Sequence, residues 1–142
     1  MRRLFLDANV LVSVLNKEYP LFTYSSRILS LASNSKFDVY TSPLCLAIVF
    51  YFAEKKHGST VAKQKIDLLS QHIQIADNLT DGVLKTLRNK SIHDFEDGLE
   101  YYAAKEKNCH FIITEDTEDF YFSEIEVLNC EGFFNQYLIV NQ

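Results

Sequence analysis

Residues 94–120 read DFEDGLEYYAAKEKNCHFIITEDTEDF, a stretch in which two groups of acids flank a helical segment and an apolar strand. A helix is predicted over residues 94–107, where apolar side chains recur at helical spacing, at Phe95, Leu99, Tyr102 and Ala103. The apolar run over residues 111–114 predicts a buried strand. Asp116 and Asp119 follow this strand closely, at the position where open α/β sheets place their active sites.

The rest of the chain repeats this alternation of strands and helices. Further strands are predicted over residues 4–6, 37–41, 73–75 and 125–128. Helices are predicted to begin after Asn9, at Ser42 and Pro43, near Ser59 and after Asp77, and also to cover residues 22–32. Residues 132–140 are expected to close the chain as a helix or a mixed tail. The alternation predicts the α/β class, as one three-layer α/β/α domain over residues 1–142 with a mostly parallel sheet of roughly five strands.

The composition is typical of a globular protein with one core, since 47% of the 142 residues are hydrophobic and 23% are charged. No apolar run approaches the roughly 20 residues of a membrane span, and the N-terminus lacks the pattern of an export signal. Cys45, Cys109 and Cys130 are odd in number and widely separated. This spacing favours small core residues in a reducing cytoplasm over disulfides or a zinc site. Together with the lack of a long apolar run, it leads us to expect a cytoplasmic protein without membrane association.

The net charge of −5 limits the possible functions. A protein that binds nucleic acid through bulk electrostatics is usually basic, because it must neutralise phosphates. Either nucleic acid is not the substrate of this chain, or its acids are concentrated in a site that a cation neutralises first.

Asp7 has the same placement as Asp116, because it directly follows the first predicted strand. If the first and fourth strands are neighbours in a parallel sheet, both carboxylates lie at one edge, and the start of the preceding helix places Asp97 over that edge. We therefore predict that Asp7, Asp97 and Asp116 hold a metal ion. Asn9 and Thr114 are predicted to support them through hydrogen bonds.

Each of these acids also has a purely structural explanation. Asp7 and Asp94 are favourable helix caps, and an acid at Asp97 is stabilised by the helix dipole. Asp116 and Asp119 lie in a predicted loop, where acids are common. The other acids of this region are expected on the solvated surface: Glu96, Glu100, Glu106, Glu115 and Glu118.

Three carboxylates gathered without a cation would repel one another and raise one another's pKa. Hard oxygen ligands suit Mg²⁺ or Mn²⁺, and such a site is well adapted to binding a phosphodiester and activating water. The competing chemistries have little support, because the four histidines are scattered and the chain lacks a glycine-rich phosphate loop.

Four segments together resemble the PIN domain, the ribonuclease fold of many bacterial toxin–antitoxin pairs. They are FLDANVLV at residues 5–12, TSPLCLAIVFYFAEK at 41–55, DFEDGLEYYAA at 94–104 and IITEDTEDF at 112–120. The resemblance implies a parallel sheet, cleavage of RNA with Mg²⁺ or Mn²⁺, homodimers and a small antitoxin partner. It also implies that Asp7 matches the first family acid, Asp97 the acid on the later helix and Asp116 the acid after the fourth strand.

One position departs from the family pattern, because Ile48 stands where the family usually has a glutamate on the helix after the second strand. Glu54 lies six residues on, about 240° further round that helix, and cannot replace it directly. Asp94 and Asp119 are the remaining candidates to compensate. The alternative function is therefore a PIN fold that binds RNA or protein with little or no catalysis.

A phosphatase of the haloacid dehalogenase type is a third hypothesis, because Asp-Ala-Asn-Val at residues 7–10 faintly resembles its nucleophile loop. Its second aspartate is Asn9 in this chain, and no lysine lies beside Asp116. Both departures argue against this class.

Overall fold

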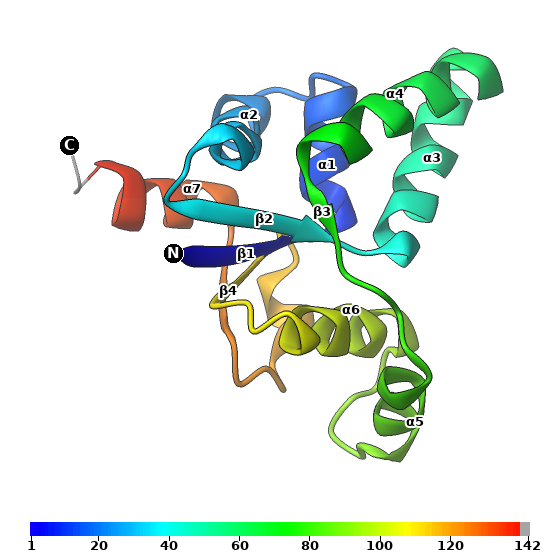
Figure 1. Cartoon of the computed structure of the whole chain (residues 1–142), viewed down its shortest axis with the longest axis vertical. Coiled ribbons are helices and arrows are strands. Elements are labelled where there is room, and N and C mark those ends of the chain that lie inside the picture. Colours follow the sequence, from blue (N-terminus) through cyan, green and yellow to red (C-terminus); the bar gives the residue numbers. More distant parts are fainter. Residues whose placement is uncertain (140–142) are drawn as a thin grey trace.

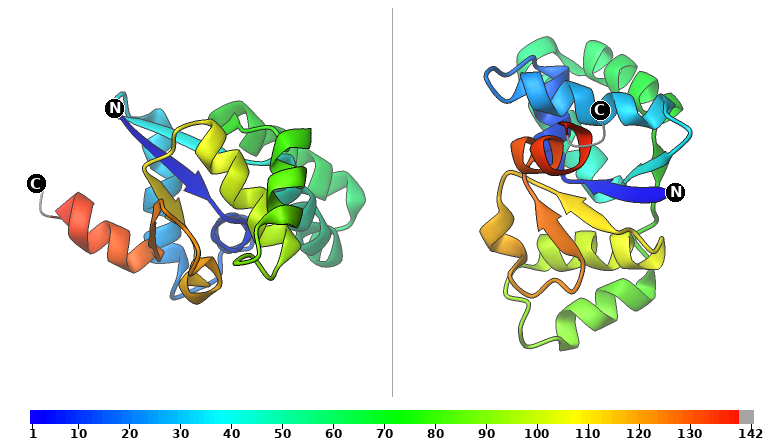
Figure 2. Two further views of the ribbon diagram at one scale, coloured as in Figure 1. Left: turned by 90° about the horizontal axis from the view of Figure 1, so that it is seen from below. Right: turned by 90° about the vertical axis from the view of Figure 1, so that its left-hand side faces the viewer.

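The computed structural model describes residues 1–139 and contains a parallel sheet in the order β3-β2-β1-β4-β5. The strands are β1 (Arg2–Leu6), β2 (Phe37–Thr41), β3 (Gln74–Ile75), β4 (Phe111–Ile113) and β5 (Glu126–Leu128). All neighbouring strands pair in parallel, and the arrows of β1, β4 and β5 can be followed in the right-hand view of Figure 2. Strand β1 pairs with both β2 and β4, with Leu4 opposite Val39 and Phe111. The first and fourth strands are neighbours, which is the condition for Asp7 and Asp116 to share one edge of the sheet.

Helices cover both faces of this sheet. Along the chain they are α1 (Ala8–Leu15), α2 (Phe22–Leu29), α3 (Pro43–His57), α4 (Ser59–His72), α5 (Thr80–Arg88), α6 (Phe95–Glu106) and α7 (Cys130–Phe133), with helical turns η1 (Ser30–Ser33), η2 (Thr117–Phe120) and η3 (Phe134–Ile139). Helices α1 to α4 lie on one face, and α5 and α6 lie on the other (Figure 1). The predicted three-layer α/β/α class is confirmed.

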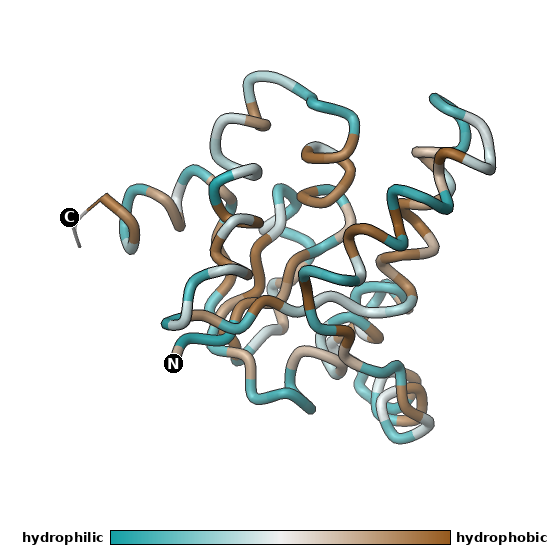
Figure 3. Tube along the Cα trace, turned by 45° about the horizontal axis from the view of Figure 1, so that its top comes forward, coloured by the Kyte–Doolittle hydropathy of each residue, from teal (hydrophilic) through white to brown (hydrophobic). Residues whose placement is uncertain are grey.

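The second half of β1 and all of β4 are apolar and buried because both faces of the sheet are covered there. Leu4, Phe5 and Leu6 of β1 are completely buried, as are Ile112 and Ile113 of β4. Figure 3 shows this hydrophobic centre and the hydrophilic turns around it. The core therefore holds β1 and β4 rigidly side by side, which fixes where their carboxyl ends meet.

The predicted helix starts at Ser42 and Asp94 are correct, as are those at Phe22 and near Ser59, whereas those after Asn9 and Asp77 are wrong. Ser42 caps α3 through the N–H of Cys45, with Pro43 in the first turn, and Asp94 caps α6. The N-cap of α1 is Asp7 and not Asn9, because the extended backbone at the end of β1 aims the Asp7 carboxylate at the N–H of Ala8. Helix α5 begins at Thr80, after Leu79, so Asp77 does not cap it.

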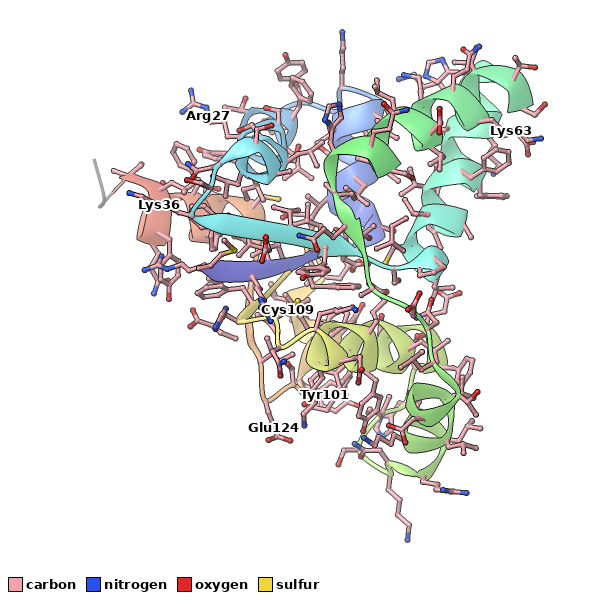
Figure 4. The ribbon with its side chains drawn as sticks, viewed as in Figure 1. Arg27, Lys36, Lys63, Tyr101, Cys109 and Glu124 are labelled. Carbon is pink, nitrogen blue, oxygen red and sulfur yellow. The ribbon has the colours of Figure 1, made fainter. Side chains whose placement is uncertain are left out.

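The three cysteines are free and buried, as predicted; Figure 4 labels Cys109 beside the sheet. None of the helices in the described part of the chain has the length and apolar character needed to span a bilayer. The predicted segment over residues 132–140 forms the end of α7 followed by η3, and Val140 lies outside the described residues.

Candidate active site

Asp7 lies at the carboxyl end of β1, where strand and helix meet. Its backbone N–H donates to the carbonyl of Ile113 at 3.0 Å, so the pairing of β1 with β4 continues up to this residue. Its side chain accepts from the N–H of Ala8 at 2.6 Å and from the Thr114 hydroxyl at 2.7 Å. Asp7 is 7% exposed, so the carboxylate is held in one orientation at the edge of the sheet.

Asn9 joins the end of β1 to the loop that follows β4. Its side-chain amide donates to the Asp116 carboxylate at 3.1 Å and to the Thr114 hydroxyl at 3.2 Å. Its side-chain oxygen accepts from the N–H of Glu115 at 3.2 Å. Asn9 and Thr114 therefore connect Asp7 to Asp116, which are distant in the sequence and close at the sheet edge.

The start of α6 adds further carboxylates to the same place. Asp94 accepts from the N–H of Asp97 at 3.1 Å and so orients the first turn of α6. A cavity of about 490 Å³ lies between this turn and the sheet edge. Its lining residues are Asp7, Ala8, Asn9, Val12, Glu18, Ile48, Phe52, Asp94, Glu96, Asp97, Glu100, Asp116 and Asp119. All the acids predicted from the sequence therefore line a single cavity, and their role in holding a metal ion stays a prediction.

Glu100 was missed from the sequence, where it was expected on the solvated surface. It is 2% exposed, and its carboxylate accepts a hydrogen bond from the Cys45 thiol at 3.1 Å. Asp7, Cys45 and Glu100 each offer an atom suited to a metal ion, and these atoms all lie within 4.8 Å of one another. The spacing contained a signal, because residues three apart project from neighbouring positions on a helix, and Glu100 lies three residues after Asp97.

The predicted apolar stripe of α6 is correspondingly only partly right. Phe95 is exposed, and the buried side of the helix is made by Gly98, Glu100, Tyr101, Ala103 and Ala104. Helix α6 packs against the sheet on one side and α5 on the other, with Gly98 directly against Thr86. Small side chains permit this close approach, so the buried face follows residue size more than hydropathy.

Within residues 1–139, none of these acids forms an ion pair with a side-chain cation. Among residues 1–139, the ion pairs are Arg3 with Asp38, Lys85 with Asp81 and Lys105 with Glu124. All of these lie away from the acidic cavity. The acids are therefore balanced by protons, solvent ions or a bound cation.

Burial and the repulsion between neighbouring acids change the acidity of the cavity groups. Burial, together with the nearby charges of Asp94, Asp7 and Asp119, raises the pKa of Asp97 to about 7. Burial also raises the pKa of Glu100 well above its ordinary value, and a hydrogen bond with Asp7 and the charge of that residue act in the same direction. Such mutual repulsion among oxygen donors is the environment that a hard divalent cation relieves.

Comparison with known proteins identifies the family. Residues 3–118 match the PIN domain, a span that includes every acid of the cavity except Asp119. This chain belongs to the PIN domain family. The match removes the haloacid dehalogenase hypothesis, because the PIN domain accounts for the same Asp7 segment within a different fold and chemistry.

Individual relatives agree with this assignment. Ribonuclease VapC1 of Aquifex aeolicus is 29% identical over 140 residues, which cover 92% of each protein. The crystal structure of VapBC2 from Rickettsia felis, bound to a DNA fragment from its promoter, has a TM-score of 0.69 at 19% identity and matches 89% of this chain and 98% of that one. The VapC20 toxin of Mycobacterium tuberculosis, which cleaves the sarcin–ricin loop, has a TM-score of 0.65 at 16% identity, covering 87% and 98%.

The departure from the PIN pattern on α3 has a clear structural consequence. Ile48 lines the cavity at the position where the resemblance places a glutamate, so α3 contributes no carboxylate there. Glu54 is exposed and lies outside the cavity lining, as the helical geometry predicts. The residues that α3 contributes to the cavity lining, Ile48 and Phe52, are therefore apolar.

The stability of the metal-free PIN domain is expected to decrease as the pH rises. The pKa of Asp97 is about 7 in the folded chain, whereas an unfolded aspartate titrates near ~3.9. Between these two pKa values the unfolded chain binds fewer protons at Asp97 than the folded chain does. The stabilisation by the bound proton is therefore complete below the pKa of Asp97 in the unfolded chain and is lost as the pH rises through its pKa in the folded chain. Thermal unfolding in EDTA, compared between about pH 5 and about pH 8, measures this decrease.

Two variants check the assignment of this pH dependence. Asp97→Asn is expected to flatten the profile, because the amide does not titrate. Asp67→Asn, on the exposed face of α4, is expected to keep the wild-type slope. Equal slopes for wild type and Asp97→Asn would exclude Asp97 as the source.

Proposed function

We propose that this chain is a metal-dependent endoribonuclease and the toxin of a toxin–antitoxin pair. The observation that carries the proposal is that Asp7, Asp97 and Asp116 line one cavity of a PIN domain, and that no lysine or arginine among residues 1–139 lines it with them. Ribonuclease VapC1, which resembles this chain over nearly its whole length, supports the same activity. We also propose that residues 1–142 form a single domain.

The cofactor proposed for this cavity is Mg²⁺ or Mn²⁺. The donors are carboxylate oxygens, which these ions prefer, and both burial and the nearby charges of Asp94, Asp7 and Asp119 raise the pKa of Asp97. Asp7, Asp97 and Asp116 are the residues proposed to hold the ion. When bound, the ion supplies positive charge that offsets the phosphodiester and favours ionisation of a water nucleophile.

The chain itself supplies positioning. Thr114 and the N–H of Ala8 fix the Asp7 carboxylate, while Asn9 fixes that of Asp116. Asp94 orients the backbone that carries Asp97, and Asp119 is proposed to add negative charge at the rim. The reaction is hydrolysis, in which a water oxygen forms a bond to phosphorus and the bond to the leaving ribose oxygen breaks.

The proposed substrate is single-stranded or looped RNA. Phe52 lines the cavity and is 45% exposed, so it offers a ring face on which a base can stack. Because the net charge is −5, affinity for RNA must come from the cation and from such local contacts more than from electrostatic attraction of the whole protein for phosphates.

A small antitoxin protein is the proposed partner, supported by structural neighbours that are VapBC complexes. The chain is further proposed to act in the cytoplasm, as a homodimer.

A second candidate function is a PIN fold that binds RNA or protein with little catalysis. Ile48 favours it, because α3 then lacks a carboxylate that the family usually provides. Loss of one acid weakens the binding of a metal ion, and the cleavage rate would fall with it.

Cleavage of a structured RNA separates the two candidates. Wild-type protein with Mn²⁺ is expected to cut the RNA, whereas the same protein in EDTA and Asp97→Asn with Mn²⁺ are expected to be inactive. Asp67→Asn serves as the control, since it removes one carboxylate from an exposed helix face. Equal cleavage by wild type and Asp97→Asn would reject catalysis at this cavity, and RNA binding without cleavage would favour the second candidate.

A further inference from the structure

We infer that Glu100 supplies the fourth carboxylate of the metal centre, from α6, in place of the one that α3 lacks at Ile48. The inference rests on the proposed function, because it concerns the same cation. Glu100 is not one of the family's four acid positions, which fall at Asp7, Ile48, Asp97 and Asp116 in this chain. Its assignment explains how a site with an apolar side chain on α3 still assembles a set of four acids.

The position of Glu100 is the first argument. Glu100 and Ile48 line the same cavity from different helices, so a carboxylate is present although it comes from the other helix. Asp7 and Glu100 offer oxygen atoms that lie within 4.8 Å of each other and of the Cys45 sulfur. Two carboxylates at that separation can contact one ion together, because hard cations bind carboxylate oxygens at about 2.0–2.6 Å.

The burial of Glu100 is the second argument. At 2% exposure, its carboxyl group has no bulk water to solvate a charge, and none of the ion pairs within residues 1–139 includes it. Buried acids in folded proteins are otherwise paired or bound to metals. If Glu100 served packing alone, its buried carboxyl group would cost more free energy of folding than a glutamine or leucine side chain of similar size.

Helix α3 has a supporting part in this arrangement. Cys45 lies one turn before Ile48, and its thiol donates to the Glu100 carboxylate at 3.1 Å. The hydrogen bond holds one carboxylate oxygen and leaves the other for Asp7 or a cation. Helix α3 therefore orients the acid of α6 and does not contribute one itself.

Direct measurement of Mn²⁺ binding tests the inference without relying on catalysis. The electron paramagnetic resonance signal of free Mn²⁺ decreases as the ion binds, which gives the dissociation constant for each variant. Glu100→Gln is expected to weaken binding by about 10-fold to 100-fold, at least as much as loss of a supporting residue around a metal. Glu106→Gln, an exposed glutamate on the same helix, is the matched control and is expected to bind as wild type does.

A relocated carboxylate provides a second prediction. Ile48→Glu introduced into the Glu100→Gln protein is expected to recover most of the lost affinity, because it returns an acid to the cavity from α3. If Glu100→Gln does not fold, Glu100→Asp replaces it, since the shorter side chain withdraws the carboxylate by one methylene and is expected to weaken binding as well.

The outcomes separate this inference from the function on which it rests. Glutamine mimics a protonated glutamate, so wild-type affinity in Glu100→Gln, or in Glu100→Asp where that variant is used, would overturn the role of Glu100. If Asp97→Asn still lost Mn²⁺ in that case, the proposed nuclease centre would stand without Glu100. Absence of Mn²⁺ binding by the wild-type protein would overturn both proposals.

Discussion

Asp7→Asn is expected to lower Mn²⁺-dependent RNA cleavage by about 100-fold or more, because a metal centre contributes several kcal/mol of transition-state stabilisation. The same substitution is expected to change the metal-free unfolding temperature little. An amide oxygen still caps α1 at the N–H of Ala8, and removal of one charge relieves repulsion with Glu100. The loss of activity would therefore arise in a folded protein. Initial rates under excess substrate, together with thermal unfolding in EDTA, measure the two effects.

The control for this variant is again Asp67→Asn, which also removes one negative charge but from an exposed position on α4. It is expected to leave both the rate and the unfolding temperature unchanged. Cleavage by Asp7→Asn at the wild-type rate would mean that the end of β1 takes no part in the reaction. A large drop in its metal-free stability would mean that Asp7 serves chiefly as a helix cap.

Phe5→Ala is expected to lower the free energy of unfolding by about 3–5 kcal/mol, the cost of truncating a large buried side chain in a core that cannot collapse around the space. Phe5 is 0% exposed and lies on β1, the central strand of the sheet. Because domains of this size are stable by only about 5–15 kcal/mol, the change removes a large share of the total. Urea denaturation measures it as a lower midpoint with an unchanged slope.

Leu87→Ala is the comparison for this prediction. Leu87 is 68% exposed in the last turn of α5, so its truncation is expected to alter stability by no more than about 0.5 kcal/mol. Similar losses in the two variants would contradict the central place of β1 in the core.

Local sequence patterns were sufficient to predict several strands, the shared edge of two acids and the cap of α6. The run from Leu4 to Leu6 and the run from Phe111 to Ile113 are apolar because helices cover both faces of a parallel sheet, and that requirement is visible in the residues themselves. Asp7 and Asp116 could be placed together because the carboxyl ends of neighbouring parallel strands share one edge. The cap of α6 at Asp94 was likewise evident from residue type and position.

Other features depended on contacts between segments far apart in the chain. Asn9 comes soon after a strand and is a residue type that often caps helices. In the fold, its side chain instead donates hydrogen bonds to Thr114 and Asp116, more than 100 residues away. The apolar stripe expected on α6 was misplaced, because α6 packs between the sheet and α5 and its small residues decide which side is buried. Neither effect is encoded in a window of neighbouring residues.

The sequence by itself determined the fold class, the family and the set of acids that follow the strands, because hydropathy and chain direction act locally. Only the tertiary structure decided the surroundings of Glu100. Whether a glutamate on a helix meets water or a buried cavity depends on which other helix packs against it, and here that neighbour is α3, through Cys45. Burial is a property of the packed layers, so the electrostatics of this site arise from the assembly of the fold.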